Sequence, residues 1–189
     1  MVIVFMDIVY AQPLKELLQM SSYFKEQIIV LVQNEVHEKK VKQAGLIPCY
    51  LIDEKNSNQI KSSKKKTAVL GGSVKANEFA VKIKADYLLQ PSNTKQFFDL
   101  GLAKKLNENK TTVVLMFEEM ADKNSFERHL FWKNYIEVVN YCSKKGTAFF
   151  VASGCKDPLH LRSKKVREAL AIILGIKKEF ASKYLEEFK

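Results

Sequence analysis

The chain alternates between short apolar runs and longer segments in which apolar and polar residues repeat at helical spacing. The apolar runs are rich in β-branched or aromatic residues and predict strands at Val2–Met6, Ile28–Val32, Leu46–Ile52, Thr67–Leu70, Tyr87–Leu89, Thr112–Phe117 and Ala148–Val151. Several of these runs are apolar almost throughout, which is typical of parallel strands covered on both faces. The pattern therefore predicts a parallel sheet.

Helical spacing fills most of the intervals between the predicted strands. One helix begins at Pro13, with Leu14, Leu17 and Leu18 on one stripe. The other helices are predicted at Val36–Gln43, Lys75–Lys84, Gln96–Asn107, Ser125–Ser143 and Ser163–Leu174, followed by an amphipathic segment from Lys177 to Phe188. About seven β–α units without a change in composition predict a single α/β domain over residues 1–189, as a barrel or an open doubly wound sheet.

The length of the chain favours a reduced form of the barrel. The common (β/α) barrel takes about 250 residues, and this chain has 189. The connection at residues 54–66 is the reduced part, because a helix would normally connect two parallel strands there. That segment is instead polar and ends in Lys64, Lys65 and Lys66. We therefore expect a compact, distorted TIM-type barrel with a basic polar loop at residues 54–66.

The charge balance changes the picture of what this domain binds. Lys and Arg number 31 against 21 Asp and Glu, which gives a formal net charge of +10. The excess is greatest over residues 54–95, which carry 9 basic and 3 acidic side chains. Such a surplus favours polyanionic partners, because each neutralised phosphate releases condensed counterions. A solvated lysine face without a nucleic-acid role is the alternative.

Histidine and cysteine are too scattered to indicate a catalytic or metal site. The three histidines lie more than 30 residues apart and none has the spacing of a zinc site: His37, His129 and His160. The three cysteines form no metal motif or disulfide framework: Cys49, Cys142 and Cys155. We therefore expect no catalytic residues and no metal ligands, with a structural or capping role for His160 and a nucleophilic Cys155 as a minor alternative.

Three carboxylates and two glycine turns leave an enzyme hypothesis open. Asp7, Asp53 and Glu118 lie at or just beyond the carboxyl ends of predicted strands, which converge on one face of a barrel. The turns Gly71-Gly72-Ser73 and Ser153-Gly154-Cys155 also follow strands, yet neither matches a nucleotide-binding or nucleophile motif. Tight turns and caps are therefore the favoured interpretation of both sets.

The start of the chain shows no targeting signal. Residues 1–7 begin apolar, without a preceding basic region or a small-residue cleavage site, and are too few to span a membrane. With unpaired cysteines, this pattern is typical of the reduced cytoplasm, which is the localisation we expect, without a membrane partner.

An ordered series of short motifs covers Thr67–Ile176. A strand ends in a glycine pair, an N-x-x-A helix start follows, and later come a short strand ending at a proline, an "LA..L.EN" helix, an A-S-G turn and an L-R-S helix entrance. The matching segments are Ala68–Gly72, Asn77 to Ala80, Ala85–Pro91, Leu102–Asn109, Ala152–Gly154, Leu161–Ser163 and Leu174-Gly175. In order and spacing, this series resembles archaeal ribonuclease P protein component 3, the counterpart of the eukaryotic thirty-kilodalton subunit. The chain departs from that pattern at Ser73, Glu78 and Cys155.

The resemblance implies a PHP-like barrel that has lost its metal-dependent active site. A protein of this family acts as a subunit of ribonuclease P, the RNA-based endoribonuclease that removes 5′ leaders from precursor tRNA. It binds no cofactor itself, while the RNA catalyst of the holoenzyme uses Mg²⁺. The implied partners are the ribonuclease P RNA, precursor tRNA through the holoenzyme, protein component 2 as a pair or heterotetramer, and the other ribonuclease P proteins. The family's motif positions correspond here to Gly71, Gly72, Asn77, Ser153, Gly154 and Arg162.

Charge and resemblance together predict contacts with RNA backbone. The candidate phosphate ligands are clustered basic residues in loops and at helix ends: Lys64, Lys65, Lys66, Lys144, Lys145, Arg162, Lys164 and Lys165. Phe97, Phe98, Phe131 and Trp132 lie on predicted helices and are expected in the core rather than as base-stacking platforms. Two other hypotheses stay open, a PHP-type metal-dependent phosphoesterase and an interaction barrel that works without RNA.

Overall fold

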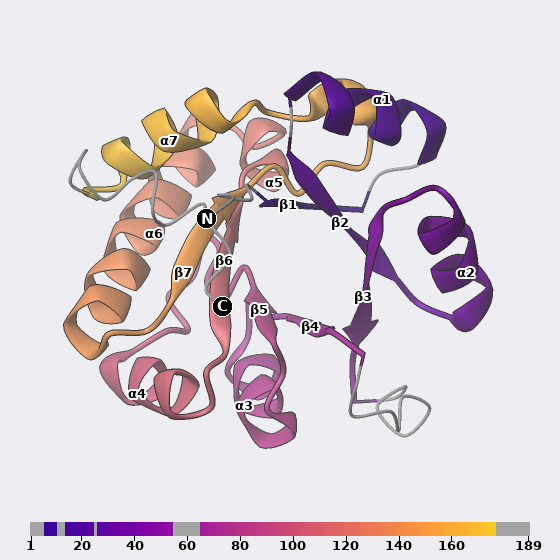
Figure 1. Cartoon of the computed structure of the whole chain (residues 1–189). Helices are drawn as coiled ribbons and strands as arrows, with labels where there is room; N and C mark the ends of the chain where they lie inside the picture. The colour runs from indigo at the N-terminus through magenta and orange to yellow at the C-terminus, as the bar shows by residue number, and fades with distance from the viewer. Residues whose placement is uncertain (1–5, 11–13, 25, 55–64, 177–189) are drawn as a thin grey trace.

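The computed structural model describes residues 6–10, 14–24, 26–54 and 65–176. Within them, seven strands form one sheet in which every strand is parallel to its neighbours and follows them in chain order (Figure 1). The strands are β1 (Met6–Val9), β2 (Gln27–Val32), β3 (Ile47–Ile52), β4 (Thr67–Leu70), β5 (Tyr87–Leu89), β6 (Thr112–Met116) and β7 (Phe149–Ala152). Sequential order with parallel pairing is the topology of a TIM-type barrel.

Seven described helices surround the strands (Figure 1). They are α1 (Leu14–Phe24), α2 (Glu35–Gln43), α3 (Val74–Ile83), α4 (Leu100–Glu108), α5 (Glu118–Ala121), α6 (Ser125–Lys145) and α7 (Lys164–Ile173), with a 3₁₀ turn at Pro158–His160 before α7. Because helices cover the outer face, β5, β6 and β7 are buried on both faces apart from Thr112. The nearly continuous apolar runs of these strands follow from that burial.

The first and last strands nearly close the barrel. The Gly154 N–H donates to the Ile8 carbonyl at 2.9 Å, and the Tyr10 N–H donates to the Cys155 carbonyl at 2.8 Å. Gly154 has a φ of +63°, and a Cβ there would lie 2.6 Å from Met116 Cε. Only glycine combines this backbone conformation with so close an approach to β6. The prediction of a compact TIM-type α/β barrel is confirmed.

The element boundaries differ from the predicted ones mainly at two places. The first described strand, β1, extends to Val9 instead of ending at Met6, so Asp7 lies inside a strand. Helix α4 begins at Leu100 and not at Gln96, because Asp99 caps it by accepting the Leu102 N–H at 2.7 Å. The carbonyls of the preceding segment are bound by side chains of other helices, including Asn77 on α3. Residues 2–5, Pro13 and the predicted helix at residues 177–188 lie outside the described residues.

Candidate functional site

A buried polar network lies where the carboxyl end of the barrel closes. Asp7 is fully buried in β1 and accepts hydrogen bonds from the Ser153 N–H at 2.7 Å and the Ser153 hydroxyl at 2.5 Å. The Ile8 N–H donates to the same carboxylate at 2.8 Å. A carboxylate held by three donors is satisfied inside the protein. Asp7 therefore joins β1 to the end of β7, and the expectation that it lies beyond a strand as a turn residue was wrong.

Arg167 supplies positive charge to this network from α7. Its side chain is fully buried and forms an ion pair with Glu26, which precedes β2, while its Nε lies 3.7 Å from Asp7 Oδ2. Burial raises the pKa of the Glu26 carboxyl, although Arg167 acts in the opposite direction. Removing one partner from such a buried set leaves an uncompensated charge, which is strongly destabilising. Neither residue was singled out from the sequence, because 141 positions separate them.

The same network fixes the backbone of Arg162 at the entrance to α7. The Arg162 N–H donates to Ser153 Oγ at 2.8 Å, and its carbonyl accepts from Arg167 Nε at 3.2 Å. The Lys164 N–H donates to Glu26 at 2.8 Å. Arg162 and Lys165 have exposed side chains, and Lys164 Nζ lies 3.3 Å from Glu168. The A-S-G and L-R-S motifs are therefore joined by one set of hydrogen bonds.

A cavity of about 490 Å³ lies beside this network. Glu118, His160 and Arg162, which the sequence analysis had considered as site residues, line it. His160 Nδ1 lies 3.0 Å from Glu118 Oε1, and this carboxylate raises the pKa of His160. Arg128 and Arg162 also line the cavity, together with the half-buried Trp132. Phe131 is buried as expected, whereas Trp132 is not fully enclosed. His160 thus forms an ion pair with Glu118 when protonated, which agrees with a structural role.

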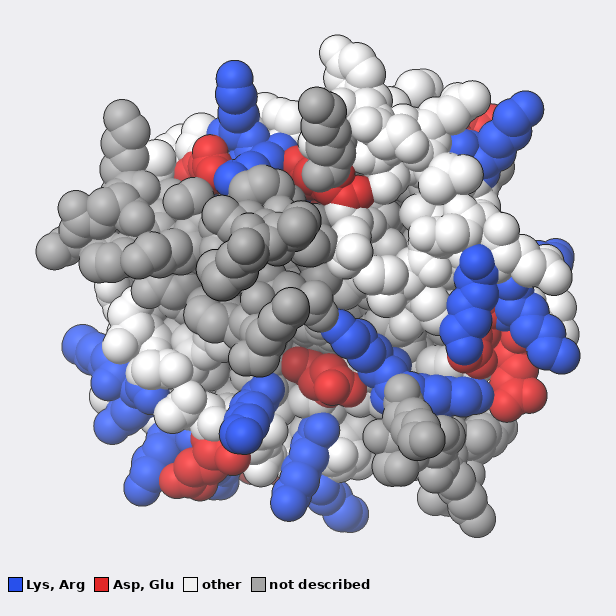
Figure 2. All heavy atoms as spheres, viewed as in Figure 1, with Lys and Arg blue, Asp and Glu red and all other residues white. Residues whose placement is uncertain are grey.

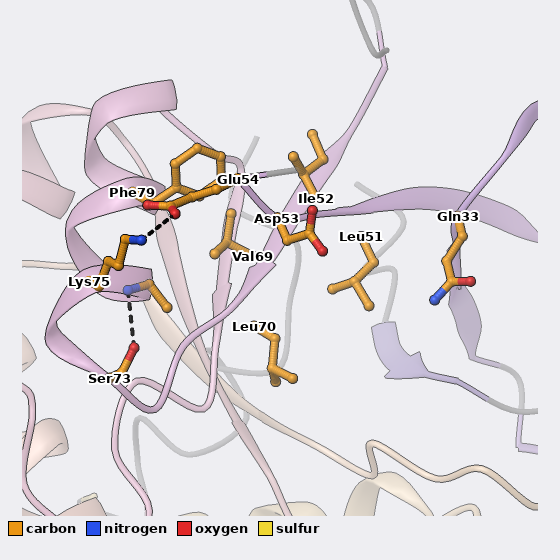
Figure 3. Close-up of a pocket in the computed structure, with 11 residues that line it drawn as sticks. Gln33, Leu51, Ile52, Asp53, Glu54, Val69, Leu70, Ser73, Lys75 and Phe79 are labelled. Atoms are coloured by element: carbon orange, nitrogen blue, oxygen red, sulfur yellow. Dashed lines mark hydrogen bonds and ion pairs between the residues drawn. The ribbon is translucent and has the colours of Figure 1, made fainter. Parts of the chain in front are cut away.

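A second cavity, of about 410 Å³, opens at the carboxyl ends of β3 and β4 (Figure 3). Its walls are mostly apolar, with Asp53 and Gln33 on one side and the first turn of α3 on the other. Lys75 Nζ lies 2.7 Å from Glu54 Oε2, so these two side chains form an ion pair. No histidine or cysteine lines this cavity. The lining of this cavity therefore offers no imidazole to a general base or a metal site.

The glycine pair after β4 forms a tight turn, and the close packing around this turn explains why glycine is needed there. A Cβ on Gly71 would lie 2.5 Å from Asn77 Oδ1 and 2.9 Å from Pro91 Cα. Asn77 donates to the carbonyls of Pro91 and Phe97 at 2.8 and 2.9 Å and so holds the loop after β5. Ser73 caps α3 by accepting the Ala76 N–H at 3.1 Å. Gly71 and Gly72 thus form the βα turn, as the sequence interpretation favoured, and the motif residue Asn77 fixes the loop after β5.

Lys65, shortly before β4, has partners within the protein. Lys65 Nζ lies 3.1 Å from Glu35, 3.1 Å from the Tyr50 hydroxyl and 3.3 Å from Glu38. Hydrogen bonds from Lys42 and Tyr50, with a smaller one from Lys65, lower the pKa of Glu38 to about 2. Two carboxylates and a tyrosine hydroxyl within the protein therefore hold the Lys65 ammonium group.

Lys66 and the lysines at the end of α6 have different surroundings. Lys66 Nζ lies 3.5 Å from the Tyr87 hydroxyl, and Lys64 lies outside the described residues. Lys144 and Lys145 are exposed in the last turn of α6. Residues before β4 and β7 lie at the amino end of a parallel barrel, whereas residues after β7 lie at its carboxyl end. The candidate phosphate ligands therefore fall into two groups at opposite ends.

Reactive groups are few among the described residues. Burial, with Asp7 and Glu118 nearby, raises the pKa of the Cys155 thiol to about 12, so the thiol is protonated at neutral pH and is a poor nucleophile. No group of three or more His, Cys, Asp or Glu side chains in the described part of the chain is arranged to hold a metal ion. None of the helices described is long and apolar enough to cross a membrane.

Comparison with known proteins finds relatives by structure and not by sequence. No family model and no curated protein matches this sequence. Over 95% of this chain and 86% of its counterpart, the structure superposes on a chain from the cryo-EM structure of archaeal ribonuclease P with mature tRNA, with a TM-score of 0.79 and 15% identity. The two chains share a fold. A crystal structure of an uncharacterized protein matches with a TM-score of 0.47, 10% identity, and coverage of 89% of this chain and 44% of the other, which is too low to support an argument.

Proposed function

We propose that this chain is a protein subunit of ribonuclease P that supports a catalytic RNA in removing 5′ leaders from precursor tRNA. The observation that carries the proposal is the similarity to a chain of archaeal ribonuclease P over 95% of this chain. The ordered motifs over Thr67–Ile176 resemble the same enzyme's protein component 3 and were identified from the sequence alone. Two independent routes thus lead to one assembly.

The chemistry of the barrel supports a role beside a catalyst more than a role as one. Barrel enzymes assemble their active sites at the carboxyl end. Here the Asp7 carboxylate accepts hydrogen bonds from Ser153, and the Glu118 carboxylate contacts His160. These interactions organise the closure of the barrel and the entrance to α7. In this proposal the reaction, with its Mg²⁺, belongs to the RNA, and the protein contributes positioning and electrostatic support.

The proposed partners follow from the same assignment. They are the ribonuclease P RNA, precursor tRNA within the holoenzyme, and the other protein subunits, among which component 2 forms a pair or heterotetramer with this chain. The formal charge of +10 favours contact with RNA backbone by charge and shape, without reading base sequence. The proposed location is the cytoplasm.

Reconstitution of precursor-tRNA cleavage tests the proposal. Cognate catalytic RNA is assayed with Mg²⁺ and the remaining protein subunits, with and without this chain. We expect the chain to increase the cleavage rate or to lower the Mg²⁺ concentration required, and to cleave nothing alone in Mg²⁺, Mn²⁺ or Zn²⁺. An unchanged rate overturns the proposal.

Metal-dependent turnover by the chain alone would favour a phosphoesterase instead. Such activity must survive repurification and be lost in Asp7→Ala or, because Asp7 is buried, in the more accessible Asp53→Ala. Asp53 is exposed at the end of β3, so its substitution leaves the barrel closure intact.

A further inference from the structure

Lysines recur at the amino ends of four consecutive strands. Lys66 directly precedes β4, Lys84 ends α3 before β5, Lys110 precedes β6 and Lys145 ends α6 before β7. Neighbouring strands in a sheet are about 5 Å apart, so these turns form a row along one rim. Figure 2 shows several basic side chains over the lower part of this face, with acidic side chains among them, in the region where Figure 1 draws α3 and α4.

This amino rim, defined by Lys66, Lys84, Lys110 and Lys145, also has two exposed acidic residues, Asp86 and Glu108, and Glu108 lies 3.8 Å from Lys104. The Asp86 carboxylate accepts the Thr67 N–H at 2.8 Å and the Thr67 hydroxyl at 3.0 Å. The side chains of Lys84, Lys110 and Lys145 are exposed. A bound polyanion would therefore meet exposed cations at these three positions.

The residues directly after the strands have the reverse charge, although Arg128 and Arg162 lie farther along the chain at that end. In the two residues that follow each strand from β2 to β7 there is no Lys or Arg, while three carboxylates occur there: Asp53, Glu54 and Glu118. Barrel proteins usually bind ligands at that carboxyl end. Here the charge distribution favours a polyanion at the other end.

A cavity of about 530 Å³ lies on the amino rim between the ends of β6 and β7. Lys110 lines it together with polar side chains that can donate hydrogen bonds, among them Asn107, Thr112 and Ser143. No carboxylate lines the cavity. A concave surface with one cation, neutral donors and no acid suits a phosphate and the adjacent ribose hydroxyl.

Helix dipoles account for part of this row. Basic residues near helix C-termini are favoured by the partial negative charge there, and α2, α3, α4 and α6 have them in their last turns, whereas α1 has none. Lys66 follows no described helix and directly precedes β4. The lysines on the amino side therefore extend over the connections into β3–β7.

We propose that the amino rim, with the cavity beside Lys110, is the surface on which this barrel binds RNA backbone. This inference rests on the proposed function for the identity of the polyanion as RNA. It assigns the RNA to the end of the barrel that enzymes of this fold leave unused, and it leaves the carboxyl end, with the cavities beside Asp53 and Glu118, to other contacts.

Matched triple variants test the surface. Lys84→Ala/Lys110→Ala/Lys145→Ala removes three charges from the amino rim, and Lys95→Ala/Lys123→Ala/Lys133→Ala removes three from elsewhere. Affinity for the cognate RNA is measured across a salt series. We expect the rim variant to bind more weakly and to reduce the slope of log affinity against log salt by about 2–3, because each phosphate contact contributes roughly 0.7–0.9. The control variant should retain the wild-type slope.

A third variant and the cleavage assay separate the possible outcomes. The third variant carries Arg162→Ala/Lys164→Ala/Lys165→Ala at the carboxyl end. If this variant has a reduced slope of log affinity against log salt while the rim variant keeps the wild-type slope, the RNA binds at the carboxyl end and the inference is wrong. If wild-type protein supports cleavage but the rim variant binds RNA with an unchanged salt slope, the amino rim is not the RNA-binding surface, while the proposed function stands. If wild-type protein does not support cleavage but the rim variant loses salt-dependent RNA binding, the surface stands and the proposed function fails.

Discussion

At the scale of single residues, the most informative feature is a fully buried arginine. Arg167 contacts Glu26, Asp7 and the carbonyl of Arg162, and each of these groups belongs to a different part of the chain. Buried charges of this kind contribute little net stability against an apolar alternative, but they specify one arrangement of the groups around them. Here that arrangement is the position of the Arg162 backbone.

Arg167→Ala is expected to lower the free energy of unfolding by about 3–5 kcal/mol, because it leaves Glu26 buried without a counter-charge. Urea denaturation followed by circular dichroism measures the change. Arg162→Ala is the matched control, since its side chain is exposed and its loss should cost less than about 0.5 kcal/mol. The double variant Glu26→Met/Arg167→Met should recover much of the loss. Equal effects of the two single arginine variants would contradict the assigned role.

At the scale of elements, the connections between strands and helices depend on close backbone approach. Gly154 lies against Met116 where β7 ends, and Gly71 lies against Asn77 where β4 ends. Both positions belong to turns at the carboxyl end, and both were singled out by motif and not by a physical requirement. Their surroundings supply that requirement: a side chain at either position would push apart two elements that the barrel brings together.

The comparison of Gly154→Ala with Gly146→Ala isolates this packing effect. Both glycines have positive φ, +63° and +69°, but a Cβ on Gly146 meets nothing within 4 Å. We expect Gly146→Ala to cost about 1–2 kcal/mol from backbone strain alone. Gly154→Ala should cost about 1–3 kcal/mol more, because of the overlap with Met116. Urea midpoints of the two variants provide the test, and equal losses would show that the closure of the barrel tolerates an added methyl group.

At the scale of the whole molecule, the barrel has two chemically distinct ends. The cavities beside Glu118 and Asp53 lie at the carboxyl end and the lysine row lies at the amino end, whereas the buried polar network joins the end of β7 to β1 and to the start of β2. The hydrogen bonds from Gly154 to Ile8 and from Tyr10 to Cys155 link the first strand to the last. Because of this link, neither half of the sheet has a complete set of neighbours without the other.

The chain is therefore expected to unfold as one cooperative unit. Trp132 is the single tryptophan and lies on α6, so its fluorescence reports on that helix, whereas far-ultraviolet circular dichroism reports on all elements. Urea transitions from the two signals should coincide in midpoint and slope. A fluorescence transition at a clearly different urea concentration would indicate separate folding units.

The sequence by itself determined the fold class and most of the elements. Apolar runs such as Tyr87–Leu89 and Thr112–Met116 mark strands because burial on both faces is a local requirement that each residue must meet. Caps such as Ser73 act over three residues, and so the start of α3 could be placed to within one residue. Net charge needs no structure, and it indicated a polyanionic partner.

Only the tertiary structure decided which of these residues act together. Arg167 and Glu26 pair across 141 positions, and no local pattern carries that information. Lys65 and Lys145 both belong to short lysine runs in the sequence. The fold nevertheless brings Glu35 and Glu38 close to Lys65 and leaves Lys145 exposed. The predicted basic residues were also divided between opposite ends of the barrel, because a residue's end depends on whether it precedes or follows its strand. Local propensity determines elements, whereas the closure of the sheet determines which side chains share a surface.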